Sequence, residues 1–235
     1  MCLADRGGDI TAALEGTKVV GPQLVRLLRN RIVRGELAPG MRLSEAEVAT
    51  AYGVSRQPVR EAFIRLADES LIEVRPQRGS YVSGIDIPTV ISAQFVRESV
   101  EADIVRQAVV RATSADVAAL EDMLGAQVEA AKVTDPQPFM ATDEAFHRRL
   151  ALIAGQGEVW DFLQPLKTQM DRVRYLSARS FPRLILVGQH SNIVDAIRQG
   201  DAVAGERVMR HHLGLILEDL PAVVAAMPDF FKRGG

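Results

Sequence analysis

The N-terminal part of the chain takes its fold from residues 35–82, GELAPGMRLSEAEVATAYGVSRQPVREAFIRLADESLIEVRPQRGSYV. Ser44 with Glu47 three residues later forms a capping box, which predicts a short helix running to about Tyr52. Gly53 supplies a tight bend. A further helix is then expected over 56–68, with Ser55 as its cap and Pro58 in its first turn, where a missing N–H costs little. Two short helices joined by a glycine bend are typical of a helix-turn-helix.

The sequence on either side of these two helices completes a small domain. Upstream, apolar residues recur at helical spacing over 23–34, and Gly35 ends that helix. Downstream, 71–75 and 80–82 are predicted to be two strands joined by a turn that contains a glycine. Three helices followed by a hairpin predict a winged helix-turn-helix over residues 21–84.

The remainder of the chain has only helical patterns. Six helices fit between its breakers, which are Pro88, Ser114, Asp135-Pro136, the glycines at 155 and 157, the stretch from Ser180 to Pro182, and Gly200. Short loops between long helices predict an antiparallel bundle over residues 85–235. Residues 1–20 show no sustained period and are expected to be a disordered leader. The predicted fold class is therefore mainly α, with a β-hairpin wing in the first domain and an all-helical second domain.

Charge is distributed unevenly along the chain, whose formal net charge is −2. Residues 22–83 contain 10 arginines and no lysine against 7 acidic residues, whereas residues 84–235 contain 16 basic and 20 acidic residues. Arginine can clamp a phosphate and can read guanine with its planar fork. The basic first domain therefore suits contact with DNA, even though the whole chain is slightly acidic.

The composition also limits where the protein works. The single Cys2 cannot form an internal disulfide or a cysteine-based zinc site. Asp5 and Asp9 interrupt the apolar stretch that a signal peptide would need, and no later run is long enough for a membrane span. We therefore expect a cytoplasmic protein with no membrane partner.

The helix over 56–68 has two different faces. Its apolar residues share one face that can pack on the other two helices, and Arg56 and Arg60 share another. The N-terminal residues of such a helix meet base edges and phosphates. The simpler alternative is a three-helix domain with a solvated arginine face, which the ordered set of cap, bend, proline and wing disfavours. The expected DNA contacts are Arg42, Ser55, Arg56, Gln57, Arg60 and Arg78.

The histidines all lie in the second domain. His190 and His212 occupy apolar helical stripes, whereas His211 lies on a mixed face and is expected at the rim. Asp143 and His147 are four residues apart and project together from one helix. Buried polar groups of this kind must bond one another or bind something. They predict either a hydrogen-bonded core cluster or a divalent metal site.

The first domain resembles the winged helix-turn-helix of the GntR family of bacterial repressors. The resemblance rests on GVSRQPVREA, FIRL and RGSYV. It implies a homodimer on a near-palindromic operator, with Ser55, Arg56, Gln57 and Arg60 in the recognition helix and Gly79 of the wing at the DNA. Ala46 departs from relatives that carry an arginine there.

The second domain resembles the FCD effector domain of the FadR-like branch of that family. Its marks are Arg97 with Glu101, then DEAFHRRLALIAG, HSNIVDAIRQGD and MRHHL. The resemblance implies a ligand-pocket role for Arg97. It also implies a metal bound by Asp143, His147, His190 and His212. Gln156 and Gln189 depart from the family pattern, and we expect these changes to affect effector choice more than metal binding.

A transcriptional regulator that acts as a repressor is the function that these patterns favour. Three imidazoles and a carboxylate leave open positions on Zn, Ni or Mn, and a small carboxylate or sugar-acid effector could complete them beside Arg97. A metallohydrolase would also need open positions on the metal, where it binds water, but the chain lacks a His-Glu-x-x-His signature and an obvious general base. A metal sensor, in which the ion itself is the signal, uses the same residues and stays an alternative.

Overall fold

The computed structural model describes residue 14 and residues 19–232, which form two compact units. The N-terminal unit runs up to Ile87 and also includes the segment that begins at Met227, and the C-terminal unit spans Pro88–Ala226. Most of the predicted leader lies outside the described residues. Val20, its last residue, already belongs to the first helix.

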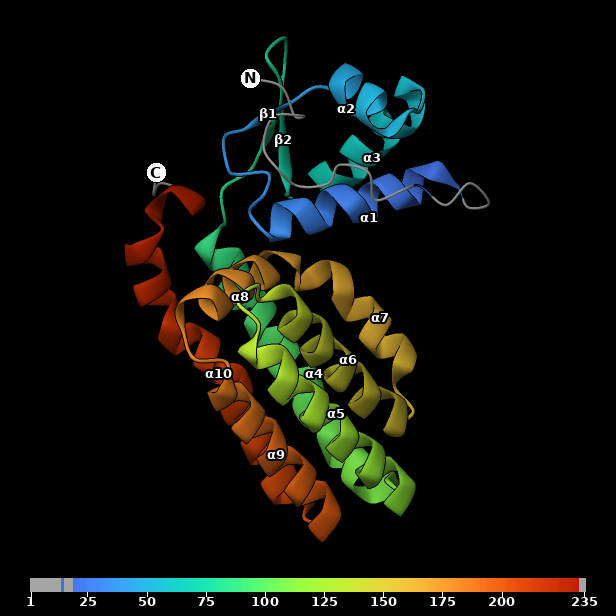
Figure 1. Ribbon diagram of the computed structural model, residues 1–235, viewed down its shortest axis with the longest axis vertical. Helices are drawn as coiled ribbons and strands as arrows, with labels where there is room; N and C mark the ends of the chain where they lie inside the picture. The colour runs from blue at the N-terminus through green and yellow to red at the C-terminus, as the bar shows by residue number, and fades with distance from the viewer. Residues whose placement is uncertain (1–13, 15–18, 233–235) are drawn as a thin grey trace. The chain divides into compact units, whose positions relative to one another are not determined.

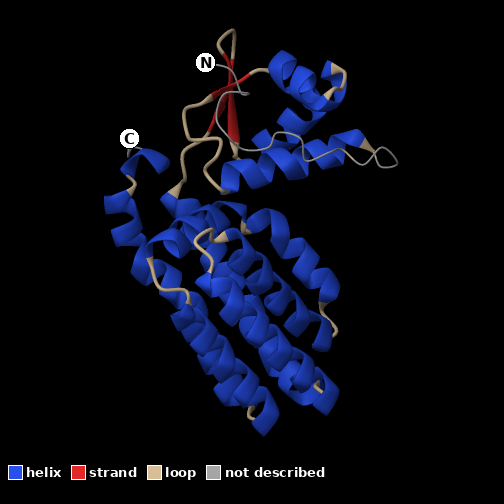
Figure 2. Ribbon diagram, viewed as in Figure 1, coloured by secondary structure: helices blue, strands red, loops and turns tan. Residues whose placement is uncertain are grey.

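The N-terminal unit consists of three helices and one small antiparallel sheet (Figures 1 and 2). The helices are α1 (Val20–Val33), α2 (Glu45–Tyr52) and α3 (Arg56–Asp68). The sheet has the order β1-β3-β2, with β1 (Arg42–Leu43), β2 (Ile72–Arg75) and β3 (Gly79–Val82). The predicted hairpin is therefore joined by a third strand that the sequence did not reveal, because two residues are too few to show an alternating pattern.

The caps of the two central helices differ. Ser44 Oγ accepts the N–H of Glu47 at 3.4 Å, as the capping box predicts for α2, and Gly53 ends that helix in the left-handed region at φ 64°. Ser55 precedes α3 in extended conformation but makes no side-chain cap, so its expected capping role was wrong. Its hydroxyl stays exposed.

The segment that follows the last long helix belongs to the N-terminal unit. After a short 3-10 helix, Pro228–Phe230, the Ile85 N–H donates to the Phe230 carbonyl at 2.8 Å, and the Lys232 N–H donates to the Ile85 carbonyl at 2.9 Å. Ile85 and Phe231 are buried by this pairing. The sequence-based assignment of everything after residue 84 to one domain therefore needs correction for residues 227–232, which we call the C-terminal segment. Their pairing is with a distant strand-like residue, which no local pattern reveals.

The C-terminal unit is a bundle of helices (Figure 1). They are α4 (Ile87–Arg111), α5 (Ser114–Lys132), α6 (Gln137–Ile153), α7 (Gly157–Leu166), α8 (Thr168–Ser180), α9 (Leu184–Gln199) and α10 (Ala202–Ala226). One helix was expected between 157 and 180, but two are present, divided at Lys167. Pro165 explains the break, since it cannot donate a helical N–H and its ring crowds the preceding turn.

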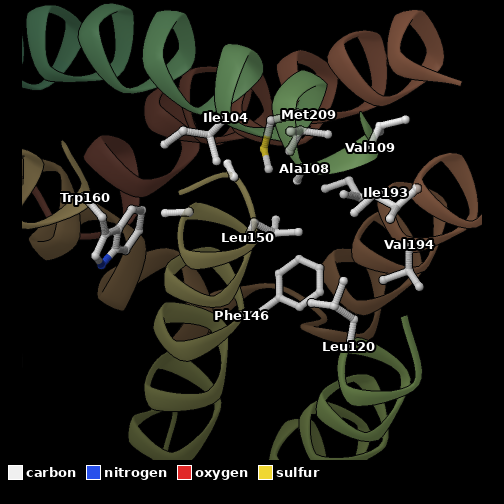
Figure 3. Packing of buried hydrophobic residues seen from close by; sticks show 14 of the residues in the cluster. Ile104, Ala108, Val109, Leu120, Phe146, Leu150, Trp160, Ile193, Val194 and Met209 are labelled. Carbon is white, nitrogen blue, oxygen red and sulfur yellow. The ribbon is translucent and has the colours of Figure 1, made fainter. Parts of the chain in front are cut away.

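The core of the bundle lies between α4, α6, α9 and α10 (Figure 3). Phe146 and Leu150 of α6 lie among Ile104 of α4, Ile193 of α9 and Met209 of α10, all at most 3% exposed. The fold is mainly helical with one small antiparallel sheet, which confirms the predicted class. Within residues 19–232, no helix is long and apolar enough to cross a membrane.

Candidate functional site

Four buried side chains from three helices meet inside the bundle. Asp143 and His147 lie one turn apart on α6, His190 comes from α9, and His212 comes from α10. Their ligand atoms all lie within 4.8 Å of one another. We call these four residues the histidine cluster. The helical spacing predicted that Asp143 and His147 project together, and the structure brings the other two to the same place.

The three imidazole rings face one another through the same kind of nitrogen. His190 Nε2 lies 3.1 Å from His212 Nε2, and His212 Nε2 lies 3.3 Å from His147 Nε2. Asp143 Oδ1 lies 3.7 Å from His190 Nε2. These separations resemble those between neighbouring ligands of one ion whose metal–nitrogen bonds are about 2.0–2.1 Å long.

Amide oxygens hold the opposite nitrogens of two of the rings. His190 Nδ1 lies 2.7 Å from Gln127 Oε1, and His212 Nδ1 lies 2.9 Å from Gln189 Oε1. Gln127 also donates its amide to the Thr142 carbonyl, which fixes its oxygen toward His190. Because an amide oxygen only accepts, both rings carry their proton on Nδ1 and keep a lone pair on Nε2.

A carboxylate has the same effect on the third ring. His147 Nδ1 lies 2.6 Å from Glu101 Oε2, within ion-pair range although not in the line of a straight hydrogen bond. Burial opposes ionisation of Glu101, but the Arg97 guanidinium and the His147 ring hold its pKa at about 2. An ionised Glu101 beside His147 Nδ1 favours the tautomer that carries its proton on Nδ1, so that Nε2 of His147 faces the cluster.

The cluster thus turns the Nε2 atoms of three imidazole rings toward one point. Burial lowers the pKa of His190 to about 3, and burial with the neighbouring rings lowers that of His212, so neither ring takes up a proton near neutrality. Converging lone pairs repel one another unless a cation lies between them. The donor set therefore fits a divalent metal such as Zn, Ni or Mn, with outer partners that orient each ligand.

Asp143 is held by an arginine from another helix. Arg174 of α8 donates to Asp143 Oδ2, which leaves Oδ1 facing His190. Burial would raise the pKa of Asp143, but Arg174, His147 and His190 together lower it well below its ordinary value. The sequence could not identify this partner, because Arg174 lies 31 residues away in the chain.

A cavity of about 140 Å³ opens beside the cluster and reaches Asp143 and His212. Arg97, only 3% exposed, lies in its wall, with its Nε bound to Glu101 Oε1. Arg97 Nη2 is buried and has no hydrogen-bond partner among the described residues. A buried guanidinium nitrogen without an acceptor is costly, which makes it a natural contact for an anion in the cavity.

Two residues that depart from the family pattern lie elsewhere than expected. Neither Gln156 nor Gln189 is among the residues that line the cavity. Gln156 donates to Gln107 at 3.0 Å, and Gln189 accepts from the ring of His212 in the histidine cluster. The structure places Gln189 against a histidine of the cluster and outside the cavity lining, and the expectation that the two glutamines affect effector choice more than metal binding stays a prediction. His211 is exposed, as its mixed face predicted.

The predicted DNA-contacting side chains of α3 lie on its exposed face. Arg56, Gln57 and Arg60 are exposed, and Gln57 donates to Glu61 at 3.0 Å. The opposite face packs in the core of the N-terminal unit through Val59, Ala62, Phe63 and Leu66. Arg65 is also exposed on α3, and the sequence reading omitted it because it lies beyond the first turns of the helix.

Two other residues that were predicted to contact DNA, Arg42 and Gly79, lie close together at the wing. Arg42 of β1 is exposed and lies across Gly79, where a Cβ would be 3.1 Å from Arg42 Nε. Gly79 has φ 99°, a conformation that favours glycine. Arg78 is exposed at the turn, and Arg75 lies 4.6 Å from the ring centre of Tyr81. The hairpin therefore presents arginines around a turn that only glycine completes without strain.

Comparisons with known proteins agree with both units. The model of the bacterial regulatory proteins of the gntR family matches residues 22–82, and the FCD domain model matches residues 94–215. The HTH-type transcriptional repressor RspR of Escherichia coli (strain K12) is 39% identical over 225 residues, which is 95% of this chain and 99% of that protein.

Solved structures show the same fold. McbR/YncC of E. coli matches with a TM-score of 0.72 at 20% identity, over 90% of this chain and 100% of that one. A GntR transcriptional regulator from Rhodococcus sp. RHA1 matches with a TM-score of 0.69 at 25% identity, over 86% of this chain and 98% of that one. These similarities cover both units.

Proposed function

Because the chain belongs to the GntR family of bacterial regulatory proteins and carries an FCD domain, it is a transcriptional regulator, and we propose that a small organic acid bound at a divalent metal controls its affinity for operator DNA. In this proposal it acts as a repressor, as the name of its E. coli relative says of that protein. It binds a near-palindromic operator as a homodimer, because a single helix-turn-helix reads only one half-site.

The observation that carries the proposal is the convergence of the three Nε2 lone pairs of His147, His190 and His212 with Asp143 Oδ1. When bound, the metal supplies a positive charge with open positions that an exogenous carboxylate can fill. The protein supplies the second contact, since Arg97 Nη2 lies buried and unpaired in the cavity wall. A metal and an arginine in one small cavity favour an anion.

The metal site is tested by three matched variants of the full chain. We expect His190→Ala and His212→Ala to lose most bound metal, while His211→Ala, on the exposed neighbour, keeps one equivalent. Elemental analysis after purification without chelators measures this. Full metal content in all three variants, or none in the wild type, would leave the cluster as a hydrogen-bonded core.

The DNA surface is tested by the salt dependence of operator binding. Arg60→Ala should weaken binding and lower the slope of log affinity against log salt by about one, since one phosphate contact is lost. Arg148→Ala, an exposed arginine of the C-terminal unit, serves as the control and should change neither value. An unchanged slope for Arg60→Ala would show that this face of α3 is not at the DNA.

The effector role is tested by gel shifts with metal-loaded and chelator-treated protein. We expect small organic acids to lower operator affinity only for the metal-loaded form, and Arg97→Gln to need higher acid concentrations. A tenfold change in affinity requires about 1.4 kcal/mol of coupling between the two sites. A response to the metal alone, with none to any acid, would make the protein a metal sensor.

A further inference from the structure

We propose that Gln77, at the tip of the wing, reads an A·T base pair of the operator from the minor groove. The inference rests on the proposed operator binding, in which the wing lies at the DNA. Gln77 was not among the residues expected at the DNA, which in the wing turn are Arg78 and Gly79. It is distinguished by an exposed side chain on a strained and tightly held backbone.

The backbone of Gln77 has a conformation that residues with a Cβ rarely adopt. Its φ is 61°, in the left-handed region, and among the described residues other than glycine only Ser70 also has a positive φ. Glycine avoids this strain, and asparagine or aspartate can offset it with a local hydrogen bond. The Gln77 side chain forms no hydrogen bond with any residue that the structure describes. Since another residue would complete the turn with less strain, the glutamine points to a function of its side chain.

The turn that carries Gln77 is held from both strands of the wing. The Arg78 N–H donates to the Arg75 carbonyl at 3.0 Å, and Pro76 comes directly before the positive φ of Gln77, an arrangement typical of a type II turn. The Tyr81 hydroxyl donates to the Arg78 carbonyl at 3.1 Å, and the Arg75 guanidinium lies 4.6 Å from the centre of the Tyr81 ring. The backbone at the tip is thus fixed before DNA binds, which reduces the entropy that binding costs.

The charges around the tip favour the minor groove. Arg75 and Arg78 flank Gln77 in the turn, Arg42 lies across Gly79, and all three arginines are exposed. Helix α3 occupies the major groove in the proposed binding, so the wing meets the DNA backbone and the adjacent minor groove. The minor groove of A·T-rich DNA is narrow and strongly negative, and it attracts arginine. These arginines therefore draw the tip toward an A·T-rich flank of each half-site.

An amide in the minor groove can distinguish base pairs by hydrogen bonding. An A·T pair presents only acceptors there, A N3 and T O2, whereas a G·C pair adds the amino group of guanine. Gln77 Nε2 can donate to an A·T acceptor, and at a G·C pair it meets the guanine amino group instead. The arginines bind the phosphates of any sequence and so position the wing. Gln77 adds the preference for one base pair.

The test uses the full-length protein and a palindromic duplex that the wild type selects from a random-sequence pool. Each A·T pair is replaced in turn by G·C and by inosine·cytosine, which has the major-groove edge of G·C but lacks the amino group in the minor groove. We expect one A·T position in each half-site, apart from those that α3 reads, where G·C lowers affinity about tenfold. Inosine·cytosine should restore the affinity at that position. Fluorescence anisotropy of the labelled duplexes measures both effects.

Two variants separate the side chain of Gln77 from its backbone. Gln77→Ala and Gln77→Gly should both bind the selected duplex about tenfold more weakly than the wild type and lose the preference for A·T over G·C. Urea unfolding should show that the glycine variant is more stable than the alanine variant. The equilibrium constant for folding should differ by about two- to fivefold, because only glycine is free of strain at a positive φ.

Ser70→Gly is the matched control, because it changes the other left-handed residue, which follows α3, and it should keep the A·T preference. Arg60→Ala should weaken binding to every duplex and also keep the preference. A preference that survives in Gln77→Ala, or inosine·cytosine that binds as weakly as G·C, overturns the role of Gln77. Equal stability of the two Gln77 variants also counts against it, since the strain would be absent. Operator binding by α3 is reported separately by the salt dependence of Arg60→Ala.

Discussion

At the scale of single residues, the site depends on the groups behind the metal-facing atoms. Gln127 and Gln189 each accept from a ring Nδ1, and Glu101 lies within ion-pair distance of the third, so these residues decide which nitrogen of each histidine faces the cluster. Such outer partners fix ring orientation and raise ligand basicity, and their loss typically lowers metal affinity 10–100-fold. The cluster is thus pre-organised by residues that lie outside it.

Gln127→Leu should lower metal affinity by roughly 10–100-fold, since His190 loses the acceptor that holds its tautomer. Competition against a chromophoric chelator measures the change. Gln107→Leu, a glutamine of α4 whose partner is Gln156, is the matched control and should bind metal normally. Equal affinity in the two variants would mean that the His190 ring is oriented by packing alone, for instance by its stacking on Phe146.

Metal-free protein should lose stability as pH falls from about 6.5 to 5. The pKa of His190 is about 3 in the folded protein and near 6.5 when exposed, so only the unfolded chain gains a proton in this range. The free energy of unfolding should therefore fall by on the order of 1.5 kcal/mol for this residue, and His212 adds in the same direction. Urea unfolding with a chelator present measures it. His190→Leu should flatten the slope, and an equally steep slope in that variant would contradict the assignment.

The sequence predicted the histidine cluster better than its surroundings. Apolar stripes and the four-residue spacing of Asp143 and His147 were enough to indicate that these side chains point inward. Arg174 and Gln127 come from helices whose register against α6 and α9 is set by packing, which no single helix pattern contains. For the same reason Gln189 was assigned to effector choice, although it contacts a histidine of the cluster.

At the scale of elements, turns and caps were predictable, whereas contacts between distant segments were not. Gly53 and the wing turn follow from local residue types. Strand β1 and the C-terminal segment exist only through partners that are far away in the sequence, namely Tyr81 and Ile85. Pro165 encodes the division of α7 from α8 locally, but the helical pattern on both sides of it conceals the break.

Gly84→Ala should destabilise the N-terminal unit, because the new Cβ would lie 2.8 Å from the backbone nitrogen of Lys232. Crowding of this kind costs on the order of 1–3 kcal/mol when backbone must shift. Chemical denaturation followed by a probe in this unit measures the loss. Gly125→Ala, in the open interior of α5, is the control and should stabilise by about 0.5–1 kcal/mol. An unchanged stability in Gly84→Ala would show that the backbone of the C-terminal segment moves away from the new Cβ without a measurable cost in free energy.

At the scale of the whole molecule, the chain passes between its two units twice, once after Ile87 and again after Ala226. Helix α10 contributes His212 and Asp219 to the cavity and then leads into the C-terminal segment on Ile85. An effector that binds one position of α10 more tightly than another would shift this helix. The shift would reach the C-terminal segment and, through its backbone pairing, Ile85 beside the other connection. Only such a difference in affinity can change DNA binding.

A chain that ends at Ala226 should keep its metal and yet have a looser N-terminal unit, since Ile85 loses both backbone partners. Hydrogen exchange should rise at Ile85 and in the adjoining part of β3, while elemental analysis should still give one equivalent. Full-length Phe231→Ala, which removes the buried ring without shortening the chain, should show a smaller rise. Unchanged exchange in both proteins would mean that the segment contributes nothing to the unit.

The pairing of Ile85 with Phe231 also means that two contacting parts of the N-terminal unit are translated at different times. A ribosome finishes the three helices and the wing first, but the residues that cover Ile85 are made only after the whole C-terminal unit, roughly 7–30 s later at ordinary elongation rates. During that interval the nascent DNA-binding unit exists without its last backbone partner. The N-terminal unit is therefore completed only after the C-terminal unit has been translated, although its helices and its sheet are translated first.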